Sequence, residues 1–311
     1  MKTKLLSLCI AVYQEEEVIL TFISEVTKEL ERLQVDYEII FVDDGSTDKT
    51  VSLISEAIKD NTQIRLIEFS YNHGKQAAIT AAIAHAKGGT LLYMDPDLQD
   101  PPHEIGQFLK KMDEGYDLVF GVRKEKKDSL LNRLYSKVFW SSLNTYTGLQ
   151  IPKGLAVMRM FNREFADQFL SYKEQNRFIE GIFMRIGMNY TTIKIDQEER
   201  RAGTTKYNFK KKMKLAFDAI FDFSELPLRL AVSFGVLLSM LGFILAVVIF
   251  ILHLSIIDFK AGWPSLITAI IFSTGLQVFF IGIAALYIGR IYLETKQRPL
   301  YSIKRTYNLD Q

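Results

Sequence analysis

Two long apolar runs towards the C-terminal end constrain this chain more than any other feature. Residues 231–252 and 263–289 contain no charged side chain. A hydrocarbon core of about 30 Å requires about 20 helical residues at about 1.5 Å each, and both runs are long enough. Burying two such helices in a soluble core would require far more protein around them than 311 residues supply. The sequence therefore predicts two transmembrane helices, at about 230–253 and 264–289.

The basic residues around these runs predict their orientation. Lysine and arginine are frequent before the first run and after the second, whereas the connecting loop contains only Lys260. The flanking basic residues are Lys210, Lys211, Lys212, Lys214, Arg229, Arg290, Lys296, Arg298, Lys304 and Arg305. Because such residues stay on the cytoplasmic side, we expect both termini in the cytoplasm and a short outer loop. The expected location is the inner (plasma) membrane, with a multi-pass chain.

An amphipathic segment precedes the first apolar run. Between residues 209 and 223, apolar side chains recur at helical spacing with lysines among them. Such a helix suits the headgroup layer beside anionic lipid, and Pro227 would end it. An ordinary surface helix packed on its own domain is the alternative. We assign 207–228 to amphipathic juxtamembrane helices and 229–311 to the two spans with a cytoplasmic C-terminal tail.

Charge and cysteine content exclude several classes of protein. Lys and Arg number 38 against 36 Asp and Glu, and the formal net charge of +2 argues against nucleic acid as a partner. The single cysteine, Cys9, excludes an intrachain disulfide and a cysteine-based zinc site. The histidines lack the i, i+4 spacing of a helical metal site.

Residues 1–206 alternate between strand and helix patterns. Strand patterns occupy 5–12, 38–42, 64–69, 90–94 and 118–122, and helix patterns occupy 18–33, 50–59, 75–86 and 103–113. This alternation predicts an α/β domain with a Rossmann-like, mostly parallel sheet and helices on both faces. Ligands of such sheets bind beyond the carboxyl ends of the strands. Neither a G-x-G-x-x-G after the first strand nor a P-loop motif is present.

Acidic residues follow three of the predicted strands. They are Glu15, Glu16 and Glu17 after the first, Asp43, Asp44 and Asp48 after the second, and Asp95, Asp97 and Asp100 after the fourth. Strand ends of one parallel sheet meet at one edge, so these carboxylates should converge and attract a cation. Asp95 and Asp97 have the oxygen-only chemistry that suits Mg²⁺ or Mn²⁺ carrying a substrate diphosphate. Local alternatives are Asp48 as a helix N-cap and Pro101-Pro102 as a helix start.

These motifs resemble those of a known enzyme family. Residues 10–17 (IAVYQEEE), 42–48 (VDDGSTD) and 95–102 (DPDLQDPP) are similar to the family 2 inverting glycosyltransferases of GT-A fold. More narrowly, the chain resembles polyprenyl-phosphate (bactoprenol) glucosyltransferases, relatives of dolichol-phosphate mannose synthase. Residues 200–207, 223–229 and 287–299 match this family's segments around the membrane. The resemblance runs from about residue 5 to 305 and implies a GT-A catalytic domain at 1–206.

The resemblance implies roles for individual residues on the donor side. Ala11, Tyr13 and Glu15 would line the nucleotide base and ribose, with Asp44 at the base. Lys75 would approach the diphosphate, and Asp95 and Asp97 would bind the metal. Tyr13 as an ordinary strand-end aromatic and Lys75 as a solvated lysine are the alternatives.

On the acceptor side, Arg200, Thr205 and Lys206 would contact phosphate near the membrane. Contacts of Arg200 and Lys206 with lipid headgroups alone are the alternative. For His73, a structural role as a hydrogen-bonded imidazole is at least as well supported as a role in the site.

The chain departs from the family pattern at residues 156–159. Relatives commonly have Gly-Asp-Phe-Arg there, so an acid often proposed as catalytic is Val157 in this chain. A polyprenyl phosphate needs no general base, because its oxygen is ionised near pH 7 (phosphomonoester second pKa about 6). The change is compatible with a different donor sugar, since relatives that transfer an aminosugar also lack that acid. Ala11, Gln14 and Leu286 replace the proline, asparagine and glutamate of relatives.

The predicted reaction is a single in-line displacement that inverts the anomeric carbon. A nucleotide sugar, a UDP-hexose with UDP-glucose as the first expectation, binds with Mg²⁺ or Mn²⁺, and undecaprenyl phosphate attacks. The lipid-linked monosaccharide would serve cell-envelope glycan modification, such as that of wall or O-antigen, after a separate flippase moves it. The resemblance also implies a homotetramer assembled through the membrane helices among membrane lipids.

Other functions stay open at this point. The same lipid could receive GlcNAc, an aminosugar or mannose. A processive polysaccharide synthase would need a Gln-x-x-Arg-Trp motif. Residues 175–178 (QNRF) are only distantly similar to that motif. A phospholipid-modifying transferase would need a general base, and a non-enzymatic membrane scaffold would have no use for the acidic strand ends.

Overall fold

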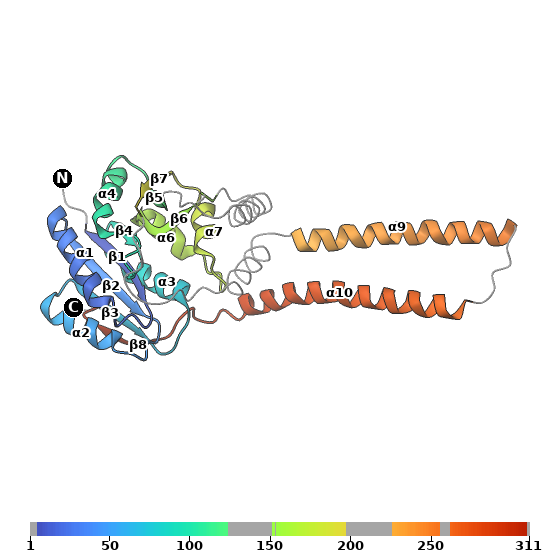
Figure 1. Ribbon diagram of the computed structural model, residues 1–311, viewed down its shortest axis with the longest axis horizontal. Helices are drawn as coiled ribbons and strands as arrows, with labels where there is room; N and C mark the ends of the chain where they lie inside the picture. The colour runs from blue at the N-terminus through green and yellow to red at the C-terminus, as the bar shows by residue number, and fades with distance from the viewer. Residues whose placement is uncertain (1–4, 124–150, 153, 197–225, 256–261, 310–311) are drawn as a thin grey trace. The chain divides into compact units, whose positions relative to one another are not determined.

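The computed structural model describes residues 5–123, 151–152, 154–196, 226–255 and 262–309. The chain divides into two compact units, Met1–Phe209 with Arg298–Gln311, and Lys210–Gln297. We call them the sheet unit and the helical unit, and Figure 1 shows their elements.

The strands, in chain order, are β1 (Leu6–Val12), β2 (Tyr37–Asp43), β3 (Ile64–Phe69), β4 (Thr90–Tyr93), β5 (Leu118–Arg123), β6 (Leu155–Asn162), β7 (Tyr190–Ile195) and β8 (Ile303–Tyr307). The helices are α1 (Ile19–Leu33), α2 (Thr50–Asp60), α3 (Lys75–His85), η1 (Pro102–Glu104), α4 (Ile105–Asp113), α6 (Arg163–Ser171), α7 (Ile179–Ile186), α9 (Leu226–Ser255) and α10 (Trp263–Thr295).

One mixed sheet organises the sheet unit. Its order is β7-β5-β6-β4-β1-β2-β3-β8. β1 pairs in parallel with β2 and β4, β2 with β3, and β5 with β7. β6 is antiparallel to β4 and β5, and β8 is antiparallel to β3. Thus β1–β5 and β7 end at one edge of the sheet, which we call the carboxyl edge, and β6 and β8 begin there.

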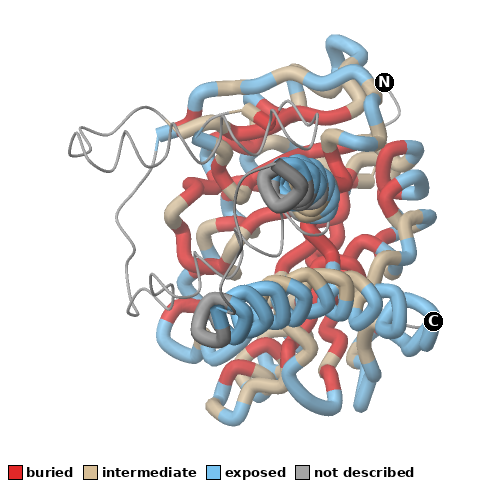
Figure 2. The backbone as a smooth tube through the Cα atoms, turned by 90° about the vertical axis from the view of Figure 1, so that its right-hand side faces the viewer, coloured by how far each residue is buried: buried red, intermediate tan, exposed pale blue. Residues whose placement is uncertain are grey.

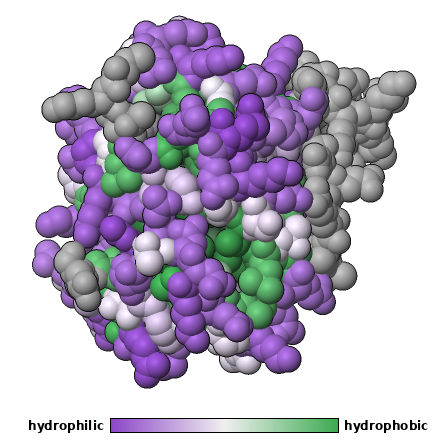
Figure 3. All heavy atoms as spheres, turned by 90° about the vertical axis from the view of Figure 1, so that its left-hand side faces the viewer, coloured by the Kyte–Doolittle hydropathy of each residue, from purple (hydrophilic) through white to green (hydrophobic). Residues whose placement is uncertain are grey.

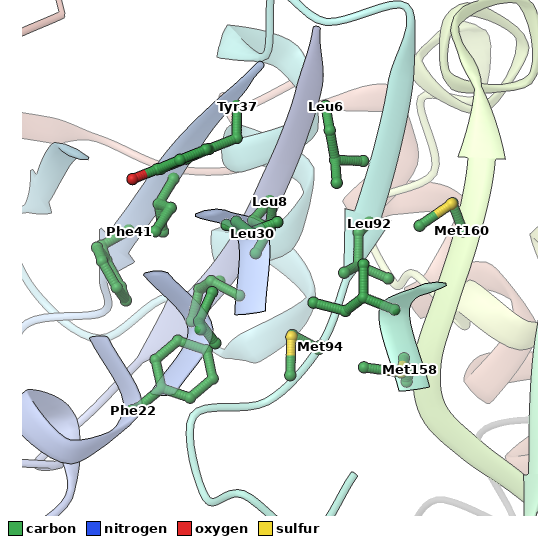
Figure 4. Close-up of a cluster of buried hydrophobic side chains, with 14 of the residues drawn as sticks. Leu6, Leu8, Phe22, Leu30, Tyr37, Phe41, Leu92, Met94, Met158 and Met160 are labelled. Atoms are coloured by element: carbon green, nitrogen blue, oxygen red, sulfur yellow. The ribbon is translucent and has the colours of Figure 1, made fainter. Parts of the chain in front are cut away.

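The core lies between the sheet and its helices. Every residue of β2 is buried, as expected for a central parallel strand covered on both faces. Phe22 and Leu30 of α1 lie over Leu8 and Phe41 of the sheet (Figure 4). In Figure 2 most of the buried segments lie in the interior, with exposed segments around them. Helical spacing of apolar residues in α1 therefore covers one sheet face, as its periodicity predicts.

The predicted α/β fold is confirmed. Each predicted strand and helix of residues 5–122 is present, and the strand predicted at 64–69 has the bounds of β3. The helix predicted at 103–113 is divided into η1 and α4. The sequence patterns do not predict β6, β7 or β8, nor α6 and α7. β8 is the most consequential of these, because the chain returns after α10 and adds a strand to the sheet.

The helical unit contains the two apolar runs. α9 and α10 pack against each other, with the rings of Phe234 and Phe280 at 6.3 Å between centroids. Within the described residues, one stretch is long and apolar enough to cross a membrane, Ala269–Thr295, with a mean hydropathy of 2.1. Leu230–Leu245 forms a shorter apolar helix. Of the two spans expected at 230–253 and 264–289, the second is supported by length and hydropathy, and the first is present as a shorter apolar helix.

Exposure differs sharply between the units. Large apolar side chains of α9 and α10 are exposed. The exposed fraction is 72% for Phe243 and 68% for Phe272. By contrast, the face of the molecule in Figure 3 is mostly hydrophilic, with small apolar patches. Water-exposed apolar surface of that extent marks a membrane or protein contact. The amphipathic segment predicted at 209–223 lies outside the described residues.

Candidate functional site

The carboxylates at the end of β2 organise two loops at the carboxyl edge. Asp43 Oδ2 accepts hydrogen bonds from the backbone N–H groups of Gly45 (3.1 Å) and Ser46 (2.9 Å). Asp44 accepts from the N–H of His73 (2.6 Å) and of Gly74 (2.9 Å). Burial raises the pKa of both carboxyls, although these N–H donors act in the opposite direction. Both carboxylate oxygens of Asp44 thus accept hydrogen bonds that hold the loop following β3.

The loop after β1 is fixed against the loop after β2. The N–H of Gln14 donates to Ser46 Oγ (2.9 Å), and the N–H of Glu15 donates to Thr50 Oγ1 (2.9 Å). Gln14 has φ 53°, a left-handed conformation that turns the chain away from the strand. Tyr13, just before it, is 36% exposed at the same edge.

A salt bridge joins the loops after β3 and β4. Lys75 begins α3, and its Nζ lies 2.6 Å from Asp95 Oδ2. Partial burial acts to lower the pKa of the Lys75 ammonium, but Tyr93 and Asp95 beside it outweigh that effect and raise the pKa. Burial raises the pKa of Tyr93 to about 12, so its hydroxyl is neutral at physiological pH. Asp95 therefore supplies the negative charge of this pair.

Asp95 and Asp97 provide oxygen donors of the kind that Mg²⁺ and Mn²⁺ prefer. Asp95 Oδ1 is buried and, among the described residues, has no hydrogen-bond partner. Asp97 is 8% exposed, and its Oδ1 accepts from the N–H of Gln99 (3.1 Å). No group of three or more His, Cys, Asp or Glu within the described residues could hold a metal ion. Two carboxylates fit an ion whose other ligands come from a substrate diphosphate and water.

Asp100 is a site residue that the sequence analysis names among the acidic strand ends but gives no role of its own. Its Oδ2 accepts from the N–H groups of Val157 and Met158, both at 2.9 Å, and its Oδ1 lies 3.7 Å from Arg123 Nη2. Burial raises the pKa of the Asp100 carboxyl, and the N–H of Met158 partly offsets this effect. Asp100 therefore ties the loop after β4 to the start of β6, where Val157 stands in place of the family's acid.

Arg159 is a second residue that the sequence analysis left without a role. Its side chain is 2% exposed, and its guanidinium lies 3.2 Å from Glu180 and 5.1 Å from the ring centre of Tyr93. Tyr93 also contacts Lys75, whose Nζ lies 5.7 Å from the ring centre. The buried guanidinium of Arg159 thus contacts the Tyr93 ring, which also contacts Lys75 of the Lys75–Asp95 pair. Arg159 keeps the arginine of the Gly-Asp-Phe-Arg pattern of relatives, but its contact with Tyr93 follows from the pairing of β6 with β4, which the sequence does not predict.

The structure brings most of the predicted site residues to one edge. Ala11, Tyr13, Glu15, Asp44, Lys75, Asp95 and Asp97 lie in or directly after β1, β2, β3 and β4 at the carboxyl edge. Arg200, Thr205 and Lys206 lie outside the described residues. Two residues of the segment 175–178, compared above with the Gln-x-x-Arg-Trp motif, make structural contacts. Gln175 donates to the carbonyl of Arg298 (2.8 Å), and Arg177 donates to Thr80 Oγ1 (3.1 Å).

Comparison with known proteins identifies this arrangement. The model of the family described as Glycosyl transferase family 2 matches residues 7–170, which include all of these strand ends. The chain belongs to glycosyl transferase family 2. It is therefore a glycosyltransferase, and the resemblance drawn from its motifs is confirmed.

Relatives of this glycosyltransferase cover nearly its whole length. A prophage bactoprenol glucosyl transferase homolog from Escherichia coli is 33% identical over 96% of this chain and 98% of its own. An undecaprenyl-phosphate 4-deoxy-4-formamido-L-arabinose transferase from Enterobacter is 32% identical over 96% and 92%. Among solved structures, glucosyl-3-phosphoglycerate synthase from Mycobacterium tuberculosis, in complex with Mn²⁺, UDP-glucose and phosphoglyceric acid, matches 70% of this chain and 78% of its own, with a TM-score of 0.51 and 18% identity. That likeness shows the shared GT-A fold.

Asp100→Ala tests the link between the loop after β4 and β6. The substitution leaves two buried N–H groups, those of Val157 and Met158, without an acceptor. We expect the glycosyltransferase to lose at least about 2 kcal/mol of unfolding free energy, and Asp100→Asn, which keeps one neutral acceptor oxygen, to lose roughly half as much. Thermal unfolding of the full chain in detergent measures both.

The pH dependence of this difference provides a control. Because burial raises the pKa of Asp100, the folded protein binds this proton at a higher pH than the unfolded chain does. Its contribution to stability is therefore greatest at low pH and declines as the pH rises through the folded-state pKa. Wild type should gain stability relative to Asp100→Asn as the pH falls through the folded-state pKa towards the ordinary aspartate value of about 4. A difference that is constant with pH would contradict the assignment.

Proposed function

We propose that this glycosyltransferase moves a sugar from a nucleotide sugar to a polyprenyl phosphate, undecaprenyl phosphate as the first expectation, and inverts the anomeric carbon. The observation that carries the proposal is its similarity over 96% of the chain to two transferases whose names give different sugars. Both names nevertheless give a bactoprenol or undecaprenyl-phosphate lipid. Similarity that extends through the membrane helices therefore favours the lipid as the shared substrate. UDP-glucose is the first expectation for the donor.

The carboxyl edge carries the residues that we propose as the donor site for this reaction. Tyr13 is partly exposed beside Asp44, which suits contact with a base and ribose, together with Ala11 and Glu15. Lys75 lies where its ammonium can approach a diphosphate while it keeps Asp95 as a partner (2.6 Å). A fixed cation at that point stabilises the negative charge that develops on a departing nucleoside diphosphate.

The chemistry requires no general base from the protein. An oxygen of the acceptor phosphate, already ionised near pH 7, forms a bond to the anomeric carbon. The bond from that carbon to the diphosphate oxygen breaks, and its electron pair leaves with the nucleoside diphosphate. No proton has to be removed from the attacking oxygen, so Val157 in place of an acid leaves the reaction intact.

Asp95 and Asp97 would hold Mg²⁺ or Mn²⁺, since their carboxylates provide oxygen donors and Asp95 Oδ1 is buried without another partner among the described residues. When bound, such an ion would neutralise charge on the diphosphate. Arg200, Thr205 and Lys206 are proposed to bind the acceptor phosphate.

Strand connectivity supports a membrane hairpin. β8 and β7 belong to one sheet, and a sheet cannot lie on both sides of a bilayer. The chain between them must therefore cross an even number of times. α10 has 33 residues and α9 has 30, or about 50 and 45 Å, so each exceeds a hydrocarbon core of about 30 Å. We propose that α9 and α10 are the two crossings and that the sheet unit lies in the cytoplasm. A lipid-linked product made there would need a separate flippase.

A donor and acceptor panel tests the proposed reaction. Purified full-length protein is incubated with polyprenyl phosphate and UDP-glucose, UDP-GlcNAc, a UDP-aminosugar or GDP-mannose, and the lipid product is weighed by mass spectrometry. We expect a product one sugar heavier than the acceptor with one donor, UDP-glucose first. Polyprenol and diacylglycerol are the control acceptors, because their hydroxyls would need a base. Product from either control, or none from the phosphate, would contradict the proposal.

Substitution of the two carboxylates tests the metal site. Asp95→Ala and Asp97→Ala should each lower turnover at least about a hundredfold, because the charge of the departing diphosphate is no longer compensated. Both variants should still insert in membranes, as fractionation would show. Asp113→Ala removes an exposed carboxylate at the end of α4 and should keep wild-type turnover. Normal turnover in both site variants would refute the assignment.

Cysteine labelling tests the topology. Cys9 is fully buried, so wild type should react little with a membrane-impermeant maleimide. In intact spheroplasts we expect Lys260→Cys, in the loop between the apolar runs, to be labelled. Asp310→Cys, beyond β8, should be labelled only after the membrane is opened. The reverse pattern would place the sheet unit outside, away from cytoplasmic nucleotide sugars.

A further inference from the structure

The segment after α10 does more than extend the sheet. We call residues 298–309 the tail segment. Its distal part is anchored on β3: Lys304 Nζ lies 2.5 Å from Glu68 Oε1, and Asn308 Nδ2 donates to the carbonyls of Thr62 (2.7 Å) and Ile64 (2.9 Å). Lys304 belongs to β8, which pairs antiparallel with β3, and Asn308 directly follows β8. The tail segment is therefore held in one register.

The proximal part of the tail segment reaches beyond β3 to the loop of residues 70–74. The carbonyl of Ser302 accepts from the N–H of Ser70 (3.0 Å), and the N–H of Ser302 donates to His73 Nε2 (3.2 Å). The ring of Tyr301 stacks on Phe69, with 5.1 Å between centroids and 9° between planes. Because β8 is antiparallel to β3, these contacts lie at the carboxyl edge, where the candidate site lies.

The same loop is held from its inner side by the candidate site. His73 donates its backbone N–H to Asp44 (2.6 Å), while its imidazole accepts from the tail segment. Gly74 also donates to Asp44, and its φ of +94° sets the direction in which Lys75 begins α3. A Cβ on Gly45 would lie 2.8 Å from the carbonyl carbon of Tyr71, so the loop has little space to move inward. One residue, His73, therefore joins the tail segment to Asp44.

We infer that the tail segment positions the donor site, and that His73 is the positioning residue through which it acts. The inference rests on the proposed function and names a role for the chain beyond the membrane helices. Held between Ser302 and Asp44, the loop of residues 70–74 keeps Lys75 within reach of Asp95 and keeps Asp44 at the donor site. Without the outer contact, the loop gains conformations in which Lys75 is misplaced, and donor binding must select against them.

Simple protection of the sheet edge does not account for these contacts. A strand that covers β3 needs the pairing of residues 303–307, which shields the edge from other chains. Tyr301 and Ser302 precede that strand: Tyr301 stacks on the last residue of β3, and Ser302 contacts Ser70 and His73 on the loop. Edge protection predicts a loss of stability when they are removed, whereas positioning predicts weaker binding of the donor nucleotide.

Two pairs of full-length variants separate these roles. His73→Phe keeps a ring beside Phe69 and Tyr71 but removes the acceptor, whereas His73→Gln restores an acceptor near the position of Nε2. Ser302→Pro removes the N–H, whereas Ser302→Ala keeps it. Each protein is purified in detergent, its unfolding temperature is recorded, and its affinity for UDP and for GDP is titrated with Mn²⁺ present. Donor and acceptor KM and kcat are then measured with the active donor.

We expect His73→Phe and Ser302→Pro to bind the nucleotide about fivefold more weakly or worse, as the loss of one hydrogen bond implies. Their donor KM should rise by a similar factor, while acceptor KM stays the same. His73→Gln and Ser302→Ala should match wild type. Should Ser302→Pro fail to fold, the two His73 variants still decide the question.

The outcomes distinguish this inference from the proposed function. If wild type binds nucleotide and turns over donor while His73→Phe binds equally tightly, the positioning role is overturned and the proposed function stands. If His73→Phe loses only kcat and unfolding temperature, the contact is structural and the positioning role is again overturned. If wild type binds no nucleotide, the proposed function and the positioning role fall together.

Discussion

The polarity of the sheet is the constraint on which the rest of this structure depends. Six strands end at one edge, so the backbone brings Asp43, Asp44, Asp95 and Asp97 together whatever their side chains prefer. At a distance of about 4 Å, two unit charges interact by about 4 kcal/mol at an effective dielectric constant of about 20. Uncompensated carboxylates would therefore oppose the fold. The N–H groups of five loop residues and the Lys75 ammonium compensate these carboxylates, and a substrate-borne cation is the proposed third means of compensation.

Backbone N–H groups compensate some of these carboxylates, whereas the Lys75 ammonium compensates Asp95. Asp43, Asp44 and Asp100 hold the loops through backbone N–H groups, although Oδ1 of Asp43 and Oδ1 of Asp100 are buried without a hydrogen-bond partner among the described residues. Asp95 instead has one oxygen on Lys75 and one buried oxygen without a partner among the described residues. An oxygen of that kind carries a desolvation cost until a cation arrives, which favours binding of a charged ligand there. The carboxylates that accept backbone N–H groups shape the site, whereas Asp95, which is paired with the Lys75 ammonium, is one of the two that we propose for the metal.

Sequence patterns predicted the parallel half of the fold because its signals are local. Residues 64–69 (IRLIEF) have apolar side chains at four of their six positions and are bounded by turns, and they form β3. β8 gave no such signal: Ile303, Lys304, Arg305 and Thr306 are exposed in the strand, so no burial pattern marks it. Its pairing depends on the anchor at Glu68, a residue more than two hundred positions away. Asp100 belonged to a recognised motif, but its partners at Val157 and Met158 follow from a loop conformation, with Leu98 at φ 58°, that spacing cannot give.

The return of the chain to its own sheet also bears on how the proposed lipid acceptor and the proposed donor could share one site. β7 ends and the tail segment begins at the carboxyl edge of the sheet unit. Under the proposed function, the acceptor would be confined to a bilayer, which raises its local concentration for a protein held in the same bilayer. The tail segment follows α10 directly in the chain, and its Ser302 contacts His73 in the loop that precedes Lys75. The tail segment is therefore the part of the chain that continues from the apolar helices to the proposed donor site.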